Sequence, residues 1–121
     1  MTKITFYKKD GVYFGFKENG HTGYAEAGED ILCSALSAMT MLIINTVEVS
    51  YDARVEYIID EETTDIELKV KSALPEFESD ERKRYAISGL IMGYLIQLND
   101  LCEEYAGYLS VEEIEFQSFP E

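Results

Sequence analysis

The chain contains few of the residues that carry reactive groups or interrupt regular structure. It has one histidine, two cysteines and two prolines among 121 residues. Two cysteines can form at most one disulfide, so a disulfide framework is excluded, and without a secretion signal they favour a reducing compartment. With 46% apolar residues and eight glycines, the composition is typical of a globular protein. The length suits a single domain over residues 1–121.

Positive charge is also scarce. Ten Lys and Arg residues stand against 24 Asp and Glu residues, which gives a formal net charge of -14. Such a surface repels the phosphates of nucleic acids and of anionic lipids, so we expect direct binding to neither. It attracts a basic partner, although the same charge can serve solubility alone.

Long unbroken apolar segments are absent. The N-terminal "MTKITFYKKDGVYF" alternates apolar and polar residues, unlike a signal peptide. The run "ILCSALSAMTMLIINTV" is interrupted by hydroxyl side chains, and "YAISGLIMGYLIQL" is too short to cross a bilayer. We therefore predict a soluble cytoplasmic protein without a membrane segment.

Two pairs of alternating segments predict β-hairpins. The segments "KITFYK" and "VYFGFK" flank the turn "KDG" within residues 3–17, and "ARVEYII" and "DIELKVK" flank the turn "DEETT". Apolar periodicity predicts helices from about residue 30 to 47 and from about 80 to 105. The first is apolar almost all round, which predicts burial on most sides. With "YLSVEEIEF" as a last strand, the order ββαββαβ predicts an α+β fold, a mostly antiparallel sheet packed with two helices.

The second predicted helix carries two further signals. Ser79 or Asp80 suits its N-cap, because a short oxygen-bearing side chain can accept hydrogen bonds from the first helical amides. Gly89 and Gly93 lie one turn apart on it. This spacing predicts a close approach to the small-residue face of the first helix, where Ala35 and Ala38 lie.

Cys33 is the first candidate for chemistry. If the first helix begins near Asp30, Cys33 lies in the opening turn, where unpaired amides and the helix dipole favour a thiolate. Asp30, Cys33, Ser34 and Ser37 then form a narrow polar stripe on an otherwise apolar helix. The alternative is a buried structural cysteine, a common role of this residue type. The other cysteine, Cys102, lies on the apolar stripe of the second helix, which predicts a place in the core.

His21 is the natural partner for such a thiol. A thiol nucleophile needs a base that takes its proton and later returns it to the leaving group, and imidazole does both. Glycines at positions 20 and 23 surround this histidine in a polar loop. A lone histidine in such a loop can equally be an exposed side chain without a catalytic role. Spacing alone therefore leaves the Cys–His dyad as one of two interpretations.

The stretch "GHTGYAEAGEDILCSALSAM" resembles the signature of the bacterial ribosomal-processing cysteine proteases, the Prp family. Chain length, the ββαββαβ order and the aromatic-rich "YLSVEEIEF" also fit, so the resemblance covers essentially the whole chain. Thr22 replaces the alanine usual after the histidine. The signature residues present in order and at matching spacing are Gly20, His21, Gly28, Asp30, Cys33 and Ser37.

The resemblance implies a cytoplasmic cysteine endopeptidase that removes a short N-terminal extension from a large-subunit ribosomal protein. It implies a homodimer, and a reaction that needs no metal and no other cofactor. By matching positions, Cys33 is the nucleophile and His21 the general base and acid. Asp30 and Ser37 either orient the dyad or line the substrate groove. The supporting or substrate-binding residues are thus Asp30, Ser37, Gly20 and Gly28.

The resemblance also implies substrates that are rich in Phe on the N-terminal side of the cleaved bond, and aromatic side chains of this chain could bind them. Tyr13, Phe14, Phe16 and Tyr24 are either core residues or the walls of an apolar groove for those Phe side chains. Two other functions also remain open. One is a non-catalytic acidic module that binds a basic ribosomal protein, and the other is a thiol hydrolase of a small amide or thioester. The acidic "DEETTD" at 60–65 is interpreted as a solvated turn and not as a metal site.

Overall fold

The computed structural model describes residues 1–20, 27–60, 62–63 and 65–118, and only the backbone of residues 27–30. It confirms the order ββαββαβ. A short π-helical turn, η1 (Thr46–Ser50), continues the first helix, and a 3-10 turn, η2 (Lys71–Ala73), follows the fourth strand. The main elements are β1 (Thr2–Lys9), β2 (Val12–Asn19), α1 (Ala27–Asn45), β3 (Glu56–Ile59), β4 (Ile66–Lys69), α2 (Glu81–Glu104) and β5 (Leu109–Glu115).

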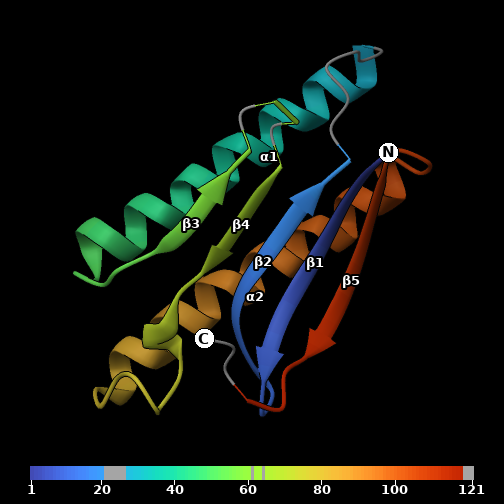
Figure 1. The fold of residues 1–121 in the computed structure, drawn as a ribbon. Helices are drawn as coiled ribbons and strands as arrows, with labels where there is room; N and C mark the ends of the chain where they lie inside the picture. The colour runs from blue at the N-terminus through green and yellow to red at the C-terminus, as the bar shows by residue number, and fades with distance from the viewer. Residues whose placement is uncertain (21–26, 61, 64, 119–121) are drawn as a thin grey trace.

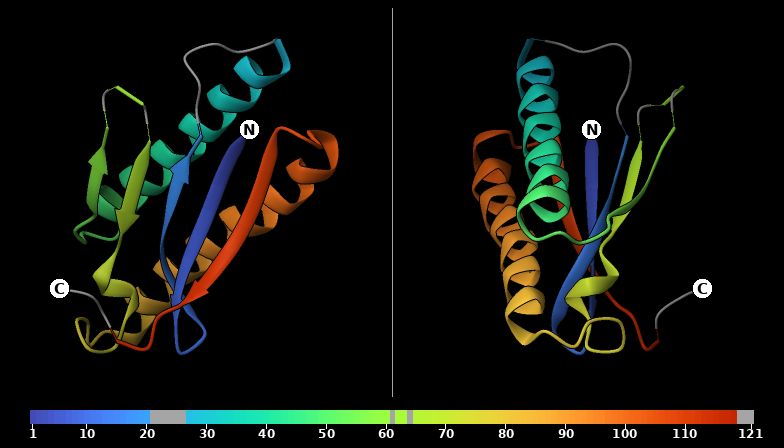
Figure 2. Two further views of the ribbon diagram at one scale, coloured as in Figure 1. Left: turned by 45° about the vertical axis from the view of Figure 1, so that its right-hand side comes forward. Right: turned by 90° about the vertical axis from the view of Figure 1, so that its left-hand side faces the viewer.

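The strands form one five-stranded sheet in the order β3-β4-β2-β1-β5. Neighbouring strands are antiparallel except at one edge, where β5 runs parallel to β1. Both helices cover the same face of this sheet, so the molecule has two layers (Figures 1 and 2). The predicted α+β fold with a mostly antiparallel sheet is confirmed.

The first hairpin owes its tight turn to two residues with positive φ. Asp10 and Gly11 have φ angles of 52° and 79°, the sign that a type I′ turn requires at both central positions. The turn places Phe6 of β1 opposite Phe16 of β2. Both side chains are fully buried, as expected of inward positions in strands whose side chains alternate between faces.

Aromatic rings join the sheet to α2. The ring centroid of Tyr94 lies 5.8 Å from that of Phe6 and 5.1 Å from that of Phe16. A second group of rings joins Phe14 to Tyr7 at 6.1 Å and to Phe116 at 5.3 Å.

Phe14 and Phe16 are 0% exposed. Their interpretation as core residues is therefore confirmed, and the alternative that they line a substrate groove is wrong. Tyr13 is partly buried and packs edge-on against Phe6. Tyr24 lies outside the described residues.

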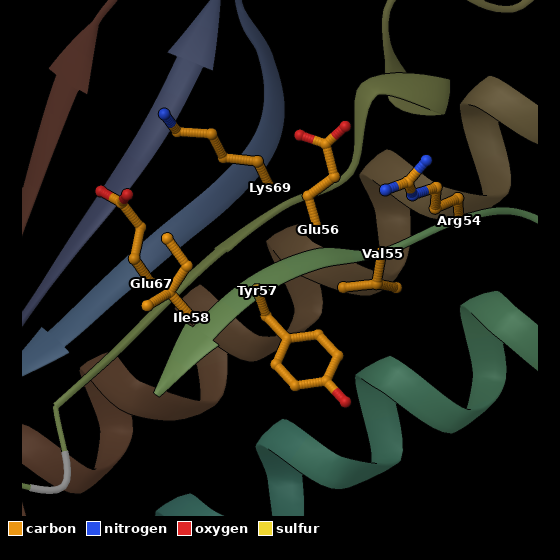
Figure 3. Close-up of a pocket in the computed structure, with 7 residues that line it drawn as sticks. All are labelled: Arg54, Val55, Glu56, Tyr57, Ile58, Glu67 and Lys69. Carbon is orange, nitrogen blue, oxygen red and sulfur yellow. The ribbon is translucent and has the colours of Figure 1, made fainter. Parts of the chain in front are cut away.

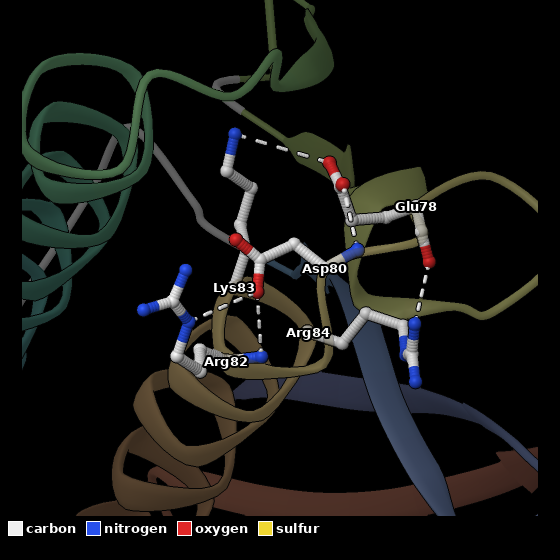
Figure 4. A network of polar contacts seen from close by, with 5 residues as sticks. All are labelled: Glu78, Asp80, Arg82, Lys83 and Arg84. Atoms are coloured by element: carbon white, nitrogen blue, oxygen red, sulfur yellow. Dashed lines mark hydrogen bonds and ion pairs between the residues drawn. The ribbon is translucent and has the colours of Figure 1, made fainter.

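The start of α2 agrees with the prediction. The Asp80 carboxylate accepts a hydrogen bond from the backbone amide of Arg82 at 2.9 Å and so acts as the N-cap. Figure 4 shows the surrounding charged side chains, with Glu78 paired to Lys83 and its carbonyl accepting from Arg84. Hydrogen bonds from Arg82 lower the pKa of Asp80. The cap thus remains ionised where it faces the positive end of the helix dipole.

Helix α1 differs from the prediction in its burial. Its inward side chains, such as Leu32, Leu36 and Ile43, are buried, but Ile31 and Leu42 are 62% and 58% exposed. Burial on most sides is therefore wrong for the single chain, because the helix packs on the sheet along only one side.

By length and composition alone, the segment Ile31–Ser50 would be apolar enough to cross a membrane. Core helices of soluble proteins also meet this criterion.

The predicted close approach of the helices at Gly89 and Gly93 is also wrong. A Cβ atom built at either glycine would meet no atom within 4 Å. Met39, Leu42 and Ile43 of α1 face this part of α2, and the space between them forms a groove of about 290 Å³. The prediction failed because bulky residues of α1, and not Ala35 and Ala38, line the groove opposite the glycines.

Two glycine substitutions, measured by urea unfolding, test the close packing of β2 on β4 and the open space beside α2. Gly15→Ala should lower the free energy of unfolding by about 1–3 kcal/mol, because its Cβ would lie 2.2 Å from the Leu68 carbonyl oxygen. Gly89→Ala should raise it by up to about 1 kcal/mol, since alanine is the better helix former and space is open there. A destabilising Gly89→Ala would instead support the close helix contact.

Candidate active site

Cys33 lies in the second turn of α1. The helix begins at Ala27, three residues before the predicted start at Asp30. Ala27 is a strong helix former, and acidic residues at positions 29 and 30 favour the positive end of a helix. The helix therefore extends back through Gly28. Its amides without an intrahelical partner therefore lie at the start of this earlier first turn, which includes Gly28.

The prediction that Cys33 occupies the opening turn is thus wrong. Because the field of a helix terminus falls off within its first turn, the dipole contributes less to Cys33 than the sequence indicated. The requirement for a separate base beside the thiol is correspondingly greater.

The thiol of Cys33 sits at a border between two sides of α1. Leu32 and Leu36 on one side are buried, whereas Ser34 and Ser37 on the other are exposed, and Cys33 itself is half-buried. The predicted polar stripe is therefore present at these positions. Cys33 differs in this respect from a fully buried structural cysteine.

Gly20 controls how the chain leaves β2. Its φ is 90°, and a Cβ atom there would lie 2.2 Å from the Met1 carbonyl oxygen, so only glycine fits. The next residue is His21, which lies outside the described residues, as does the side chain of Asp30. The structure brings the end of β2 and the beginning of α1 to the same end of the molecule (Figures 1 and 2). Gly28, which precedes the predicted helix start near residue 30, lies within α1.

Near this end, a carboxylate that the sequence analysis missed is buried between three elements. Glu18 of β2 is 3% exposed. Its Oε1 accepts a hydrogen bond from the Tyr94 hydroxyl of α2 at 2.5 Å and from the Thr40 hydroxyl of α1 at 3.0 Å. One signal could have identified it: Glu18 is in phase with Phe16, which faces the core, whereas Lys17 faces solvent.

Burial raises the pKa of Glu18, and the hydrogen bonds from Tyr94 and Thr40 partly oppose this shift. The folded protein therefore holds this proton more tightly than the unfolded chain does. The resulting contribution to stability is complete below the ordinary pKa of a glutamate and is lost as the pH rises through the folded-state pKa. Ionisation of the buried Glu18 therefore costs stability.

Cys102 has a different environment from Cys33. It is half-buried, as Cys33 is, but it packs against the edge of the core from α2, where the prediction placed it within the core. Burial raises the pKa of its thiol. Both cysteines lie in the described part of the chain and no disulfide joins them.

A separate hollow of about 540 Å³ lies on the β3–β4 hairpin (Figure 3). Glu56, Ile58, Glu67 and Lys69 point to one side of the hairpin there, and Tyr57 points toward α1. The lining contains no cysteine, serine or histidine, so it offers no nucleophile and no imidazole base. Within the described residues, no group of three His, Cys, Asp or Glu side chains is placed to hold a metal ion.

Comparison with known proteins identifies the class to which this thiol-bearing α+β fold belongs, that of the cysteine proteases. The chain belongs to the family of the cysteine protease Prp, whose model matches residues 1–110. A search of curated proteins gave no match.

Solved structures share the fold over nearly the whole chain. SMU.848 from Streptococcus mutans is 25% identical, with a TM-score of 0.78 over 96% of this chain and 99% of that one. The essential ribosomal processing protease Prp from S. aureus, in complex with a substrate peptide, is 16% identical, with a TM-score of 0.76 over 94% and 100% of the two chains. The same protease with a covalently linked product peptide is 17% identical, with a TM-score of 0.73 over the same shares.

Alkylation by iodoacetamide should distinguish the two cysteines. Thiolate is the reacting form, and the raised pKa of Cys102 leaves it little thiolate at neutral pH. We expect Cys33, at the edge of the polar stripe, to be modified first when time points are mapped by mass spectrometry. Earlier modification of Cys102 would contradict the assigned environments.

Proposed function

We propose that the protein is a cytoplasmic cysteine endopeptidase that removes a short N-terminal extension from a large-subunit ribosomal protein. The observation that carries the proposal is the half-buried thiol of Cys33 at the edge of a polar stripe in a member of the Prp family. The related S. aureus protease has been crystallised with a substrate peptide and with a covalently linked product peptide. A covalent product is what a thiol nucleophile forms.

The proposed reaction uses Cys33 and His21. The Cys33 sulfur attacks the carbonyl carbon of the scissile peptide bond while the His21 imidazole takes the thiol proton. The imidazolium then gives that proton to the leaving amine, the C–N bond breaks, and a thioester remains on Cys33. His21 next takes a proton from water as the water attacks the thioester. Release of the acid product restores the thiol.

The remaining signature residues have supporting roles in this proposal. Ser37 is exposed one turn after Cys33 and about 40° around the helix from it, so its hydroxyl can bind the substrate backbone. Gly20 sets the direction in which the chain leaves β2 toward His21. The Gly28 amide is one of the four amides at the start of α1 without an intrahelical partner, and Asp30 lies in that turn.

A homodimer fits the surface of the two helices. Several large apolar side chains on α1 and α2 are about half exposed or more in the single chain, and a second copy would remove them from water. The net charge of -14 does not suit nucleic acid or anionic lipid but suits a basic ribosomal protein. The exposed apolar residues of the helices include Ile31, Met41, Leu42, Met92 and Ile96.

Substitution of the dyad tests the proposal directly. Cys33→Ala should abolish peptide cleavage and change the free energy of unfolding by only about 1 kcal/mol, because it removes one half-buried atom. His21→Ala should lower kcat by about 100-fold or more, as loss of a general base does. Cys102→Ala is the matched control and should cleave like the wild type.

Cleavage kinetics on one peptide, with unfolding curves for each variant, provide the measurement. Cleavage by Cys33→Ala at the wild-type rate would overturn the assignment of the nucleophile. A loss of less than about tenfold in His21→Ala would show that another group acts as the base.

A further inference from the structure

The buried carboxylate of Glu18 connects the two segments from which the proposed dyad arises. Glu18 lies on β2, three residues before His21, and two before Gly20, where the chain is tightly packed against Met1. Its Oε1 accepts from Thr40 of α1 and from Tyr94 of α2. One oxygen atom of Glu18 therefore connects β2, the strand that precedes His21 in the sequence, with both helices.

Thr40 is aligned with Cys33 along α1. It follows Cys33 by seven residues, which is two turns, so the two side chains differ by about 20° around the axis and about 10 Å along it. Thr40 is 4% exposed, and Glu18 and Tyr94 are 3% and 5% exposed. A hydrogen bond in so closed a space tolerates little displacement of its partners. The Glu18–Thr40 bond thus limits how far β2 can slide or rotate relative to the Cys33 side of the helix.

Stability does not explain why this position holds a glutamate. The pKa of Glu18 is raised by burial, so ionisation of this carboxyl group weakens the fold. Apolar residues of similar volume in place of a buried polar network are often neutral or stabilising. What the network supplies is a directional contact that apolar packing lacks.

We propose that Glu18 is a positioning residue that holds β2, and with it His21, in register with the Cys33 side of α1. The inference rests on the proposed Cys33–His21 dyad. Small errors in the relative placement of reacting groups carry large losses in rate. The hydrogen-bond network of Glu18, Thr40 and Tyr94, here called the clamp, therefore acts on kcat through the base and has no direct contact with substrate.

Two variants separate the clamp from mere burial. Glu18→Gln keeps an oxygen acceptor for both hydroxyl donors in the same volume. The triple variant Glu18→Leu, Thr40→Val, Tyr94→Phe removes the network but leaves no buried donor unpaired. Tyr7→Phe is the matched control, because Tyr7 is a buried tyrosine that donates to Glu67 at 2.5 Å on another part of the sheet.

Peptide cleavage and thermal unfolding are measured for each variant. The triple variant should unfold at or above the wild-type temperature while its kcat falls about tenfold or more and its KM changes little. Glu18→Gln should stay within about threefold of wild type in kcat because the hydrogen-bond geometry is retained. Tyr7→Phe should match the wild type in kcat.

Iodoacetamide alkylation of Cys33, with and without His21→Ala, provides a readout that a purely structural role would not change. The triple substitution should slow alkylation about tenfold when His21 is present and less than about twofold when it is absent, since interacting groups are non-additive. Equal slowing in both backgrounds would show that the network does not act through His21, and would overturn the proposal.

The remaining outcomes are also decisive. A triple variant that fails to fold would show that the network is structural, and a triple variant with wild-type kcat would show that the clamp is not needed. Glu18→Gln as impaired as the triple variant would show that charge matters and not the acceptor geometry. Each of these overturns the positioning role and leaves the dyad intact if His21→Ala is inactive. If His21→Ala cleaves and alkylates like the wild type, the proposed function and this inference both fail.

Discussion

The packing of Phe6 and Phe16 against Tyr94 is the contact on which the rest of the fold depends. These side chains join the central strands β1 and β2 to α2, and Phe6 and Phe16 are fully buried. Loss of one such phenylalanine side chain typically costs about 3–5 kcal/mol, a large part of the stability of a domain of this size. β1 and β2 in turn align β5 on one side and β4 on the other. The position of β2 therefore follows from packing in the core and does not depend on the catalytic groups.

The same tyrosine also links the core to the site. The ring of Tyr94 packs on the aromatic cluster, while its hydroxyl donates to Glu18 next to the end of β2. The core thus borders on a polar contact near the end of β2, three residues before His21 in the sequence. Stability and site geometry place different demands on this contact, because apolar residues at all three positions, 18, 40 and 94, would serve the core equally well.

Local signals allowed much of the fold to be predicted from sequence. Asp10-Gly11 specified a hairpin turn, and Asp80 specified the start of α2, because both effects operate over a few residues. The predicted start of α1 was three residues too late, because a glycine at position 28 disfavours a helix although acidic residues follow it at the positive end. The contact at Gly89 was wrong because it depends on which residues of α1 lie opposite, and periodicity does not determine that.

The candidate site could be predicted only where residues are close in sequence. Cys33 and Ser37 share one helix, and their relation follows from helical spacing. The hydrogen-bond partners of Glu18 lie 22 and 76 positions away, so its role required the folded arrangement. Its position in phase with Phe16 was the one local sign that a charged side chain faces inward.

The most direct test of the proposed endopeptidase activity is the mass of the product formed from an N-terminally extended large-subunit ribosomal protein. The purified protein is incubated with this substrate, and intact masses are followed over time. The account predicts one truncated product that has lost a short N-terminal segment, and its rate should follow the amount of enzyme. An uncleaved ribosomal protein, together with rapid hydrolysis of a small thioester or amide by the same preparation, would contradict it.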